Sequence, residues 1–177
     1  DGGLIALRDR IEAEGDGRIK PIRLPWQYTN EAMGFGLTPG QVTVIAGSAG
    51  VSKSYWLLNV LRYAGSLGFR WRLLPLEDDA GRWIQRMLAV HLCSGAMVAQ
   101  PEDDSEQTRR RVADVKLAAL EGNSEIVGQW YEFISENPRL PVDDGTGAKV
   151  VRDVHFRDVL AFLESIAEDC DLIGLDC

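Results

Sequence analysis

The sequence has few of the residues that build disulfide frameworks or zinc sites. It contains three cysteines, Cys93, Cys170 and Cys177, with no C-x-x-C spacing, and two histidines, His91 and His155. A disulfide-stapled domain needs several cysteine pairs, and a structural zinc ion needs four Cys or His ligands. Neither kind of protein is indicated, and the sparse cysteine usage favours a reducing, cytoplasmic compartment.

Long apolar runs, linkers and repeats are also missing. No run approaches the about 18 apolar residues of a membrane-spanning helix, and no secretory signal pattern is present, so no membrane association is expected. No stretch rich in Gly, Ser and Pro divides the chain. The net charge of −8 has the wrong sign for a surface that attracts nucleic acid everywhere, although a local basic channel or loop remains compatible with it.

The chain does contain enough apolar sequence for one packed domain. With 177 residues, 45% of them hydrophobic, it would bury about 70% of the surface that its unfolded form exposes. We expect a domain over residues 21–177 and an N-terminal arm over residues 1–20. In the arm, Leu4, Leu7 and Ile11 form the apolar stripe of a helix that ends near Gly15 and Gly17. Because the chain begins with Asp1 and stops soon after "DLIGL", we expect a fragment of a longer protein.

The most informative stretch is "VIAGSAGVSKSYW", residues 44–56. It follows the phosphate-binding pattern G-x-x-x-x-G-K-[ST] at Gly47, Lys53 and Ser54, but Ser52 takes the place of the second glycine. In such a loop, backbone N–H groups and the N-terminus of the next helix gather on a phosphate group. Lys53 would contact the outer phosphates, and the Ser54 hydroxyl would help to coordinate a magnesium ion.

Ser52 weakens this motif without overturning it. If the position requires a positive φ, a residue with a Cβ costs about 1 to 2 kcal/mol, which is small beside the about 5 to 15 kcal/mol that stabilises a domain. The alternative, an ordinary glycine turn, would need strand, turn, lysine, hydroxyl and helix to coincide by chance. The candidate nucleotide-binding residues are Gly47, Ser48, Ala49, Gly50, Val51, Ser52, Lys53, Ser54 and Tyr55.

Strand and helix patterns alternate along the chain, which is typical of an α/β domain with a mostly parallel sheet flanked by helices. The segment "QVTVIAG" (residues 41–47) is apolar and β-branched, as expected of a central strand buried on both faces. Further strands are expected in "RWRLLPLEDD" (residues 70–79, ending near Pro75), in "RLPV" (residues 139–142) and from Leu172 to Asp176. Helices are expected over about 53–65, 80–94, 104–121, 125–135 and 156–166, with Asp104 and Asp153 as N-caps.

Two acidic residues follow strands at the ends where open α/β sheets place their ligands, namely Glu77 and Asp176. A nucleoside triphosphatase needs one carboxylate that positions the attacking water and a second one near the metal ion. Asp78 and Asp79 compete with Glu77 for the first role, although helix capping or solvation is the plainer interpretation of both. The sequence therefore predicts a phosphate-binding loop with two acids beside it.

Four blocks together resemble the RecA-like domain of DnaB-type replicative helicases, particularly the phage and mitochondrial primase-helicases of the Twinkle kind. They are "PWQYTNEAMGFGLTPGQVTVIAGSAGVSKS" (residues 25–54), "LLPLEDD" (73–79), "QRMLA" (85–89) and "CDLIGLDC" (170–177). The resemblance covers residues 25–177, and the combined spacing of the blocks makes it specific. Ser52 departs from the family pattern, and the chain stops after its second acidic strand, before the DNA-contacting loops and arginine finger of such proteins.

The resemblance implies a RecA-like P-loop NTPase fold, truncated after the Walker B strand, in the ATP-hydrolysing motor domain of a hexameric, 5′-to-3′ DNA helicase for replication. It implies ATP and Mg²⁺ as cofactors, with Lys53 and Glu77 in catalysis and Ser54 and Asp176 near the metal ion. Single-stranded DNA would bind mostly through regions beyond Cys177. The N-terminal helix would pack on a neighbouring subunit of the homo-oligomer.

Two other functions remain open. In one, the Ser52 change has impaired hydrolysis, and the chain is a nucleotide-dependent binding or assembly module. In the other, the chain belongs to a RecA-like recombinase or regulatory ATPase, which shares the phosphate loop.

Other notable side chains have plainer structural interpretations. The arginines at 109–111 could contact phosphate, but acidic residues at i, i+4 spacing favour a solvated helix face. The aromatic residues at 130, 131 and 133 could stack on bases, but aromatics in an amphipathic helix more often fill the core. His91 and His155 lack partner ligands, so we assign them no chemistry.

Overall fold

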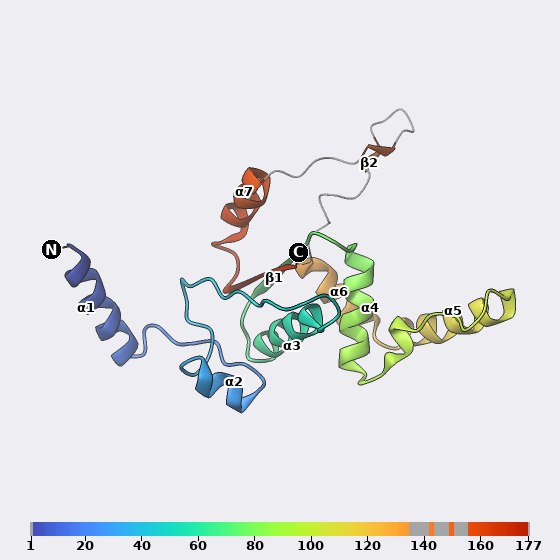
Figure 1. The fold of residues 1–177 in the computed structure, drawn as a ribbon, viewed down its shortest axis with the longest axis horizontal. Coiled ribbons are helices and arrows are strands. Elements are labelled where there is room, and N and C mark those ends of the chain that lie inside the picture. The colour runs from blue at the N-terminus through green and yellow to red at the C-terminus, as the bar shows by residue number, and fades with distance from the viewer. Residues whose placement is uncertain (1, 135–141, 144–148, 151–155, 177) are drawn as a thin grey trace.

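A computed structural model describes residues 2–134, 142–143, 149–150 and 156–176 (Figure 1). In chain order its elements are α1 (Gly2–Gly15), α2 (Gln27–Ala32), α3 (Lys53–Ser66), β1 (Trp71–Pro75), α4 (Ala80–His91), the 3-10 helix η1 (Gly95–Val98), α5 (Glu106–Glu121), α6 (Ser124–Phe133), β2 (Val142–Asp143), β3 (Lys149–Val150), α7 (Phe156–Ile166) and β4 (Leu172–Asp176). The chain is therefore of mixed helix and strand, as predicted.

The centre of the fold is a two-stranded parallel sheet made of β1 and β4, which lie far apart in the sequence. The register runs from Trp71 opposite Leu172 to Pro75 opposite Asp176. Beyond the last pair, the Leu76 N–H donates to the Asp176 carbonyl oxygen at 2.9 Å. Both strands end where the sequence predicted, and because they are parallel, the acids that follow them share one edge of the sheet.

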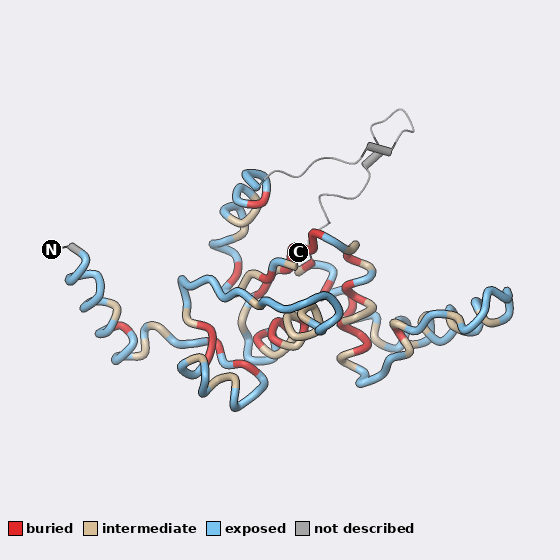
Figure 2. Tube along the Cα trace, viewed as in Figure 1, coloured by how far each residue is buried: buried red, intermediate tan, exposed pale blue. Residues whose placement is uncertain are grey.

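Helices cover both faces of this sheet because alternate strand residues point to opposite sides. Trp71 and Leu73 are buried in the main hydrophobic cluster, to which α3, α4 and α6 contribute. Leu74 faces the other side, where it packs with Val159 of α7. In Figure 2 the buried residues gather around this central region, whereas α1 and α5 extend from it and are largely exposed.

The predicted helices are present, with small differences at their ends. The helix expected over about 53–65 is α3, which begins at Lys53 and ends at Ser66. The predicted N-cap of α5 was wrong: Ser105, not Asp104, caps it, because the Ser105 hydroxyl accepts the Thr108 N–H at 3.2 Å. The Ser105 N–H in turn donates to Asp103 at 2.8 Å, so an acid fixes the capping residue.

The central strand predicted over residues 41–47 is not present. The structure has no strand there, and the side chains of Val42 and Val44 are 91% and 80% exposed. In the described part of the chain the parallel sheet contains only β1 and β4, so this segment has no neighbouring strand to supply backbone hydrogen bonds. An apolar, β-branched composition favours a strand but cannot create one without a partner.

The N-terminal arm contains the predicted helix, α1, which ends at Gly15. Its apolar residues Leu4, Leu7 and Ile11 are exposed. The connection that follows contains a short helix, α2, that the sequence did not predict. The Asn30 side chain fixes it by accepting the Leu24 N–H and donating to the Leu24 carbonyl oxygen, both at 2.7 Å.

Some predictions lie outside the described residues. They are the "RLPV" strand apart from Val142, which begins β2, the Asp153 cap, and the surroundings of His155 and Cys177. The β2 strand pairs with β3 in an antiparallel sheet.

Candidate functional site

The predicted phosphate-binding loop leads directly into the N-terminus of α3. Gly50 has φ 80°, and Ser52, the residue before the helix, has φ 63° and ψ 31°. A Cβ on Gly47 would lie 2.7 Å from Cγ2 of Val51, so a larger residue there would require the exposed Val51 side chain to move. The first backbone N–H groups of α3 have no partner within the helix and carry its positive dipole end, which is where an anion binds.

Lys53 folds back over this loop. Its ammonium group donates to the carbonyl oxygens of Gly47 and Ser48, each at 3.0 Å. The positive charge is therefore held within the loop that the motif assigns to phosphate. The loop residues Ser48, Ala49, Gly50, Val51 and Ser52 are exposed, so a ligand in solvent can reach them.

Ser54 and Asp176 are brought together although 122 residues separate them in the sequence. The Ser54 hydroxyl donates to Oδ1 of Asp176 at 3.0 Å. Burial raises the pKa of Asp176, the hydrogen bond from Ser54 opposes this shift, and the nearby charge of Glu77 adds to it. The two predicted metal-associated residues thus meet beside the first turn of α3.

Glu77 lies in the turn between β1 and α4 and its side chain is exposed. The negative charge of Glu77 raises the pKa of Asp176, so the two carboxylates lie close enough to interact electrostatically. Asp79, one of its two competitors, is the N-cap of α4 and accepts the Arg82 N–H at 2.8 Å. That capping bond assigns Asp79 the structural role that the sequence favoured for it.

Tyr55 differs from the other candidate nucleotide-binding residues. Its side chain packs against the main hydrophobic cluster, and its carbonyl oxygen accepts a hydrogen bond from the Asn59 side chain at 2.8 Å. The side chain of Tyr55 therefore faces the core rather than the loop.

Sequence reasoning missed one charged contact beside the site. Arg86 of α4 forms an ion pair with Oδ2 of Asp78 at 2.6 Å, next to Glu77. The signal was available, because Arg82 and Arg86 lie four residues apart on α4, and Asp78 stands four residues before Arg82, just ahead of the helix.

The residues present suit a magnesium ion that is held together with a nucleotide. Among the described residues, no group of three or more His, Cys, Asp and Glu side chains is arranged to hold a metal ion. Mg²⁺ usually takes one or two protein oxygen ligands and completes its shell with phosphates and water. Ser54 and Asp176 provide such a pair, 3.0 Å apart.

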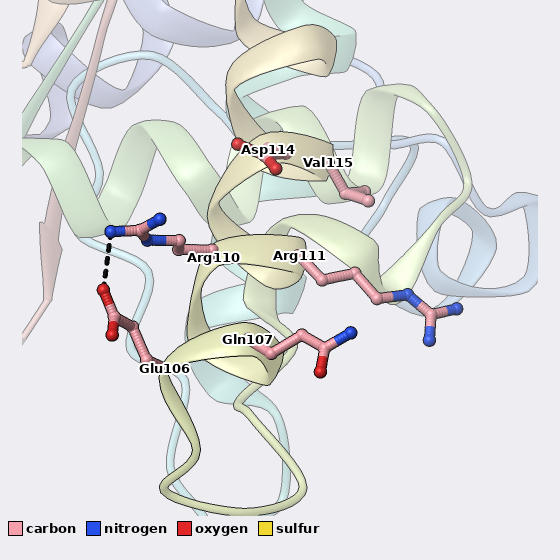
Figure 3. A pocket seen from close by; sticks show the side chains of 6 residues that line it. All are labelled: Glu106, Gln107, Arg110, Arg111, Asp114 and Val115. Carbon is pink, nitrogen blue, oxygen red and sulfur yellow. Dashed lines mark ion pairs between the residues drawn. The ribbon is translucent and has the colours of Figure 1, made fainter.

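A surface hollow on α5 is not part of this site. Figure 3 shows its six lining side chains, all of which come from that one helix: Glu106, Gln107, Arg110, Arg111, Asp114 and Val115. Arg110 forms the predicted i, i+4 ion pair with Glu106. A hollow with one wall cannot enclose a ligand.

No protein-family model, curated protein or solved structure matches this chain at a significant level. Within the described residues, no helix combines the length and the apolar character that crossing a bilayer requires. The functional assignment therefore depends on the residues themselves.

Proposed function

We propose that this chain binds Mg²⁺–ATP at the N-terminus of α3 and hydrolyses it, as a RecA-like P-loop ATPase domain. The observation that carries the proposal is the 3.0 Å hydrogen bond between Ser54 and Asp176. It joins the hydroxyl of the phosphate motif to the acid at the end of β4. If the loop were an ordinary glycine turn, nothing would require Ser54 to contact the carboxylate at the end of β4, 122 residues away in the sequence.

Each residue has a definite task in this proposal. The loop N–H groups and Lys53 bind the phosphates, and Ser54 and Asp176 hold the metal ion. Glu77 accepts the hydrogen bond that orients the attacking water. The magnesium ion, when bound, neutralises charge on the phosphate oxygens.

The helicase assignment is the finer part of the proposal and draws on the four blocks of sequence resemblance. In it, the chain is part of a ring of identical subunits that moves on single-stranded DNA. The exposed apolar residues of α1, Leu4, Leu7 and Ile11, supply a surface for a neighbouring subunit. Stimulation of ATP turnover by single-stranded DNA tests the DNA partner.

A second candidate function is a nucleotide-dependent assembly module without efficient hydrolysis. The left-handed backbone of Ser52 at φ 63° favours it, because a strained residue in the phosphate loop can displace the phosphate from its reactive position. The Ser52→Gly variant distinguishes the two. A large gain in turnover supports the assembly module, and unchanged turnover supports the ATPase.

Phosphate release from Mg²⁺–ATP tests the main proposal. Lys53→Ala should lower kcat/KM about a hundredfold or more, since the phosphate loses a charged donor. Glu77→Gln should lower kcat by about two orders of magnitude or more. Lys20→Ala and Glu125→Gln, which change exposed residues elsewhere, are the controls. Wild-type turnover in both site variants would refute the assignment.

A further inference from the structure

We propose that Arg86 is a positioning residue for Glu77, and that it acts through its ion pair with Asp78. The inference rests on the proposed ATPase function and adds a residue to it. Arg86 does not need to contact the nucleotide. It fixes the turn that carries the carboxylate assigned to the attacking water.

The contact between Arg86 and Asp78 is short and largely withdrawn from solvent. Nη1 of Arg86 lies 2.6 Å from Oδ2 of Asp78, and the two side chains are 25% and 16% exposed. The Arg86 guanidinium also lies over the ring of Trp83, 5.6 Å from its centroid, and Trp83 is fully buried. A guanidinium held between a carboxylate and a buried indole has little freedom to move.

Asp78 completes a set of contacts that hold the residues around Glu77. On one side, the Leu76 N–H is bonded to the Asp176 carbonyl oxygen at 2.9 Å. On the other side, Asp79 caps α4 through the Arg82 N–H. Leu76 is thus held by its own N–H group, and Asp79 by the N–H group of Arg82. Asp78 is held by the side chain of Arg86. The backbone of Glu77 is therefore fixed, although its side chain is exposed.

Arg86 also offsets a local excess of negative charge. Burial raises the pKa of Asp176, and the charges of Glu77 and Asp78 raise it further, whereas the charge of Arg86 lowers it. Without Arg86, less positive charge would offset the repulsion among the carboxylates of Glu77, Asp78 and Asp176, and the exposed Glu77 side chain would turn away from the other two.

The structure supplies a matched control in Arg82. Its Nη1 contacts the other oxygen of Asp78 at 3.0 Å, but its side chain is 63% exposed. Exposed ion pairs contribute little because water screens them. Arg82→Gln therefore removes one positive charge beside the Asp78 carboxylate and leaves the less exposed contact between Arg86 and Asp78 in place.

The test measures Mg²⁺–ATP affinity and phosphate release for the whole chain and its variants. Arg86→Gln should lower kcat about ten- to a hundredfold, since small misplacements of a reacting group have effects of this size. Its ATP affinity should stay within about twofold of wild type, because Lys53 and the loop are intact. Arg86→Lys should recover part of kcat, and Arg82→Gln should change kcat less than about twofold. If Arg86→Gln does not fold, Asp78→Asn replaces it, and we expect the same fall in kcat.

The outcomes separate the inference from the function on which it rests. A wild-type chain that does not bind Mg²⁺–ATP overturns the proposed function together with the inference. A wild-type chain that binds ATP without turnover overturns the hydrolysis in the proposed function as well as the inference. Arg86 and Asp78 variants with wild-type kcat overturn the inference alone. Equal losses in affinity and kcat would show a merely structural role and would also overturn it.

Discussion

At the scale of single residues, Ser52 affects both the match to the phosphate motif and the stability of the loop. Its φ of 63° and ψ of 31° lie in the left-handed region, where the second glycine of the motif would carry no Cβ penalty. Ser52 thus adopts a backbone conformation that glycine would adopt without strain. The same residue that weakens the motif as a sequence pattern stores strain in the folded chain.

Replacing Ser52 by glycine should stabilise the protein. Removing the Cβ relieves about 1 to 2 kcal/mol of strain, from which about 0.5 to 1 kcal/mol of extra backbone entropy must be subtracted. We expect the free energy of unfolding to rise by about 0.5 to 1 kcal/mol in urea denaturation. Ser48→Gly is the control, because Ser48 is not among the residues with a positive φ, and it should be destabilising. A less stable Ser52→Gly variant would contradict the strain assignment.

Two aspartates at the two ends of β4 should respond to pH in opposite ways. Burial raises the pKa of Asp176, whereas the side-chain hydrogen bond from Arg70 lowers the pKa of Asp171. The ionised Asp176 therefore costs stability at neutral pH, and the ionised Asp171 contributes stability that is lost as pH falls through its folded pKa. Asp176→Asn should raise the melting temperature at pH 7, and Asp171→Asn should lower it.

Both differences from wild type should shrink as pH is lowered to about 3, below the ordinary aspartate value near 3.9. Thermal unfolding followed by circular dichroism across this range is the measurement. Differences of the same sign for the two variants would contradict the assigned causes.

At the scale of elements, local sequence signals predicted what local interactions decide. Pro75 and Asp176 end their strands where expected, and α3 begins at Lys53, because end signals act within a few residues. The prediction of a strand over residues 41–47 was wrong, because a strand depends on a neighbouring strand that composition does not encode. The Ser54 to Asp176 contact was predictable only through motif and topology together, and the Asp78 to Arg86 pair needed attention to helical spacing.

Two helical glycines should show how packing overrides helix propensity. A Cβ on Gly65 of α3 would lie 2.8 Å from Nε1 of Trp71, whereas a Cβ on Gly128 of α6 would meet nothing within 4 Å. Gly128→Ala should raise the free energy of unfolding by about 0.5 to 1 kcal/mol. Gly65→Ala should lower it by about 1 kcal/mol or more, because Trp71 is buried and cannot move freely. Equal effects in denaturant titrations would contradict the packing argument.

At the scale of the whole molecule, the sheet and the helices on its two faces place the candidate site at one end of β1 and β4, while α1 extends from this centre (Figure 1). The sequence predicted the mixture of helix and strand, a helix near the N-terminus and the proximity of Ser54 to Asp176. It did not predict α2, which a local contact between the Asn30 side chain and the Leu24 backbone holds, or the exposed 41–47 segment, which has no strand beside it among the described residues.

The exposed apolar stripe of α1 should support self-association. Leu4, Leu7 and Ile11 are exposed, and burying them against another subunit would gain about 1.5 to 3 kcal/mol for each fully buried side chain. Sedimentation velocity should show assemblies of the wild-type chain, and the double variant Leu7→Glu, Ile11→Glu should remain monomeric. Ala6→Glu, on the opposite side of α1, should still assemble. A monomeric wild type would refute the assembly role of α1.

The most direct test of the site is the calorimetric titration of the chain with Mg²⁺–ATP. If the loop and Lys53 bind the triphosphate, wild type should give a saturable binding curve. Lys53→Ala should bind about 10- to 100-fold more weakly, as expected for the loss of a hydrogen bond to a charged group. Equal affinity of the two proteins, or no binding by either, would contradict the account.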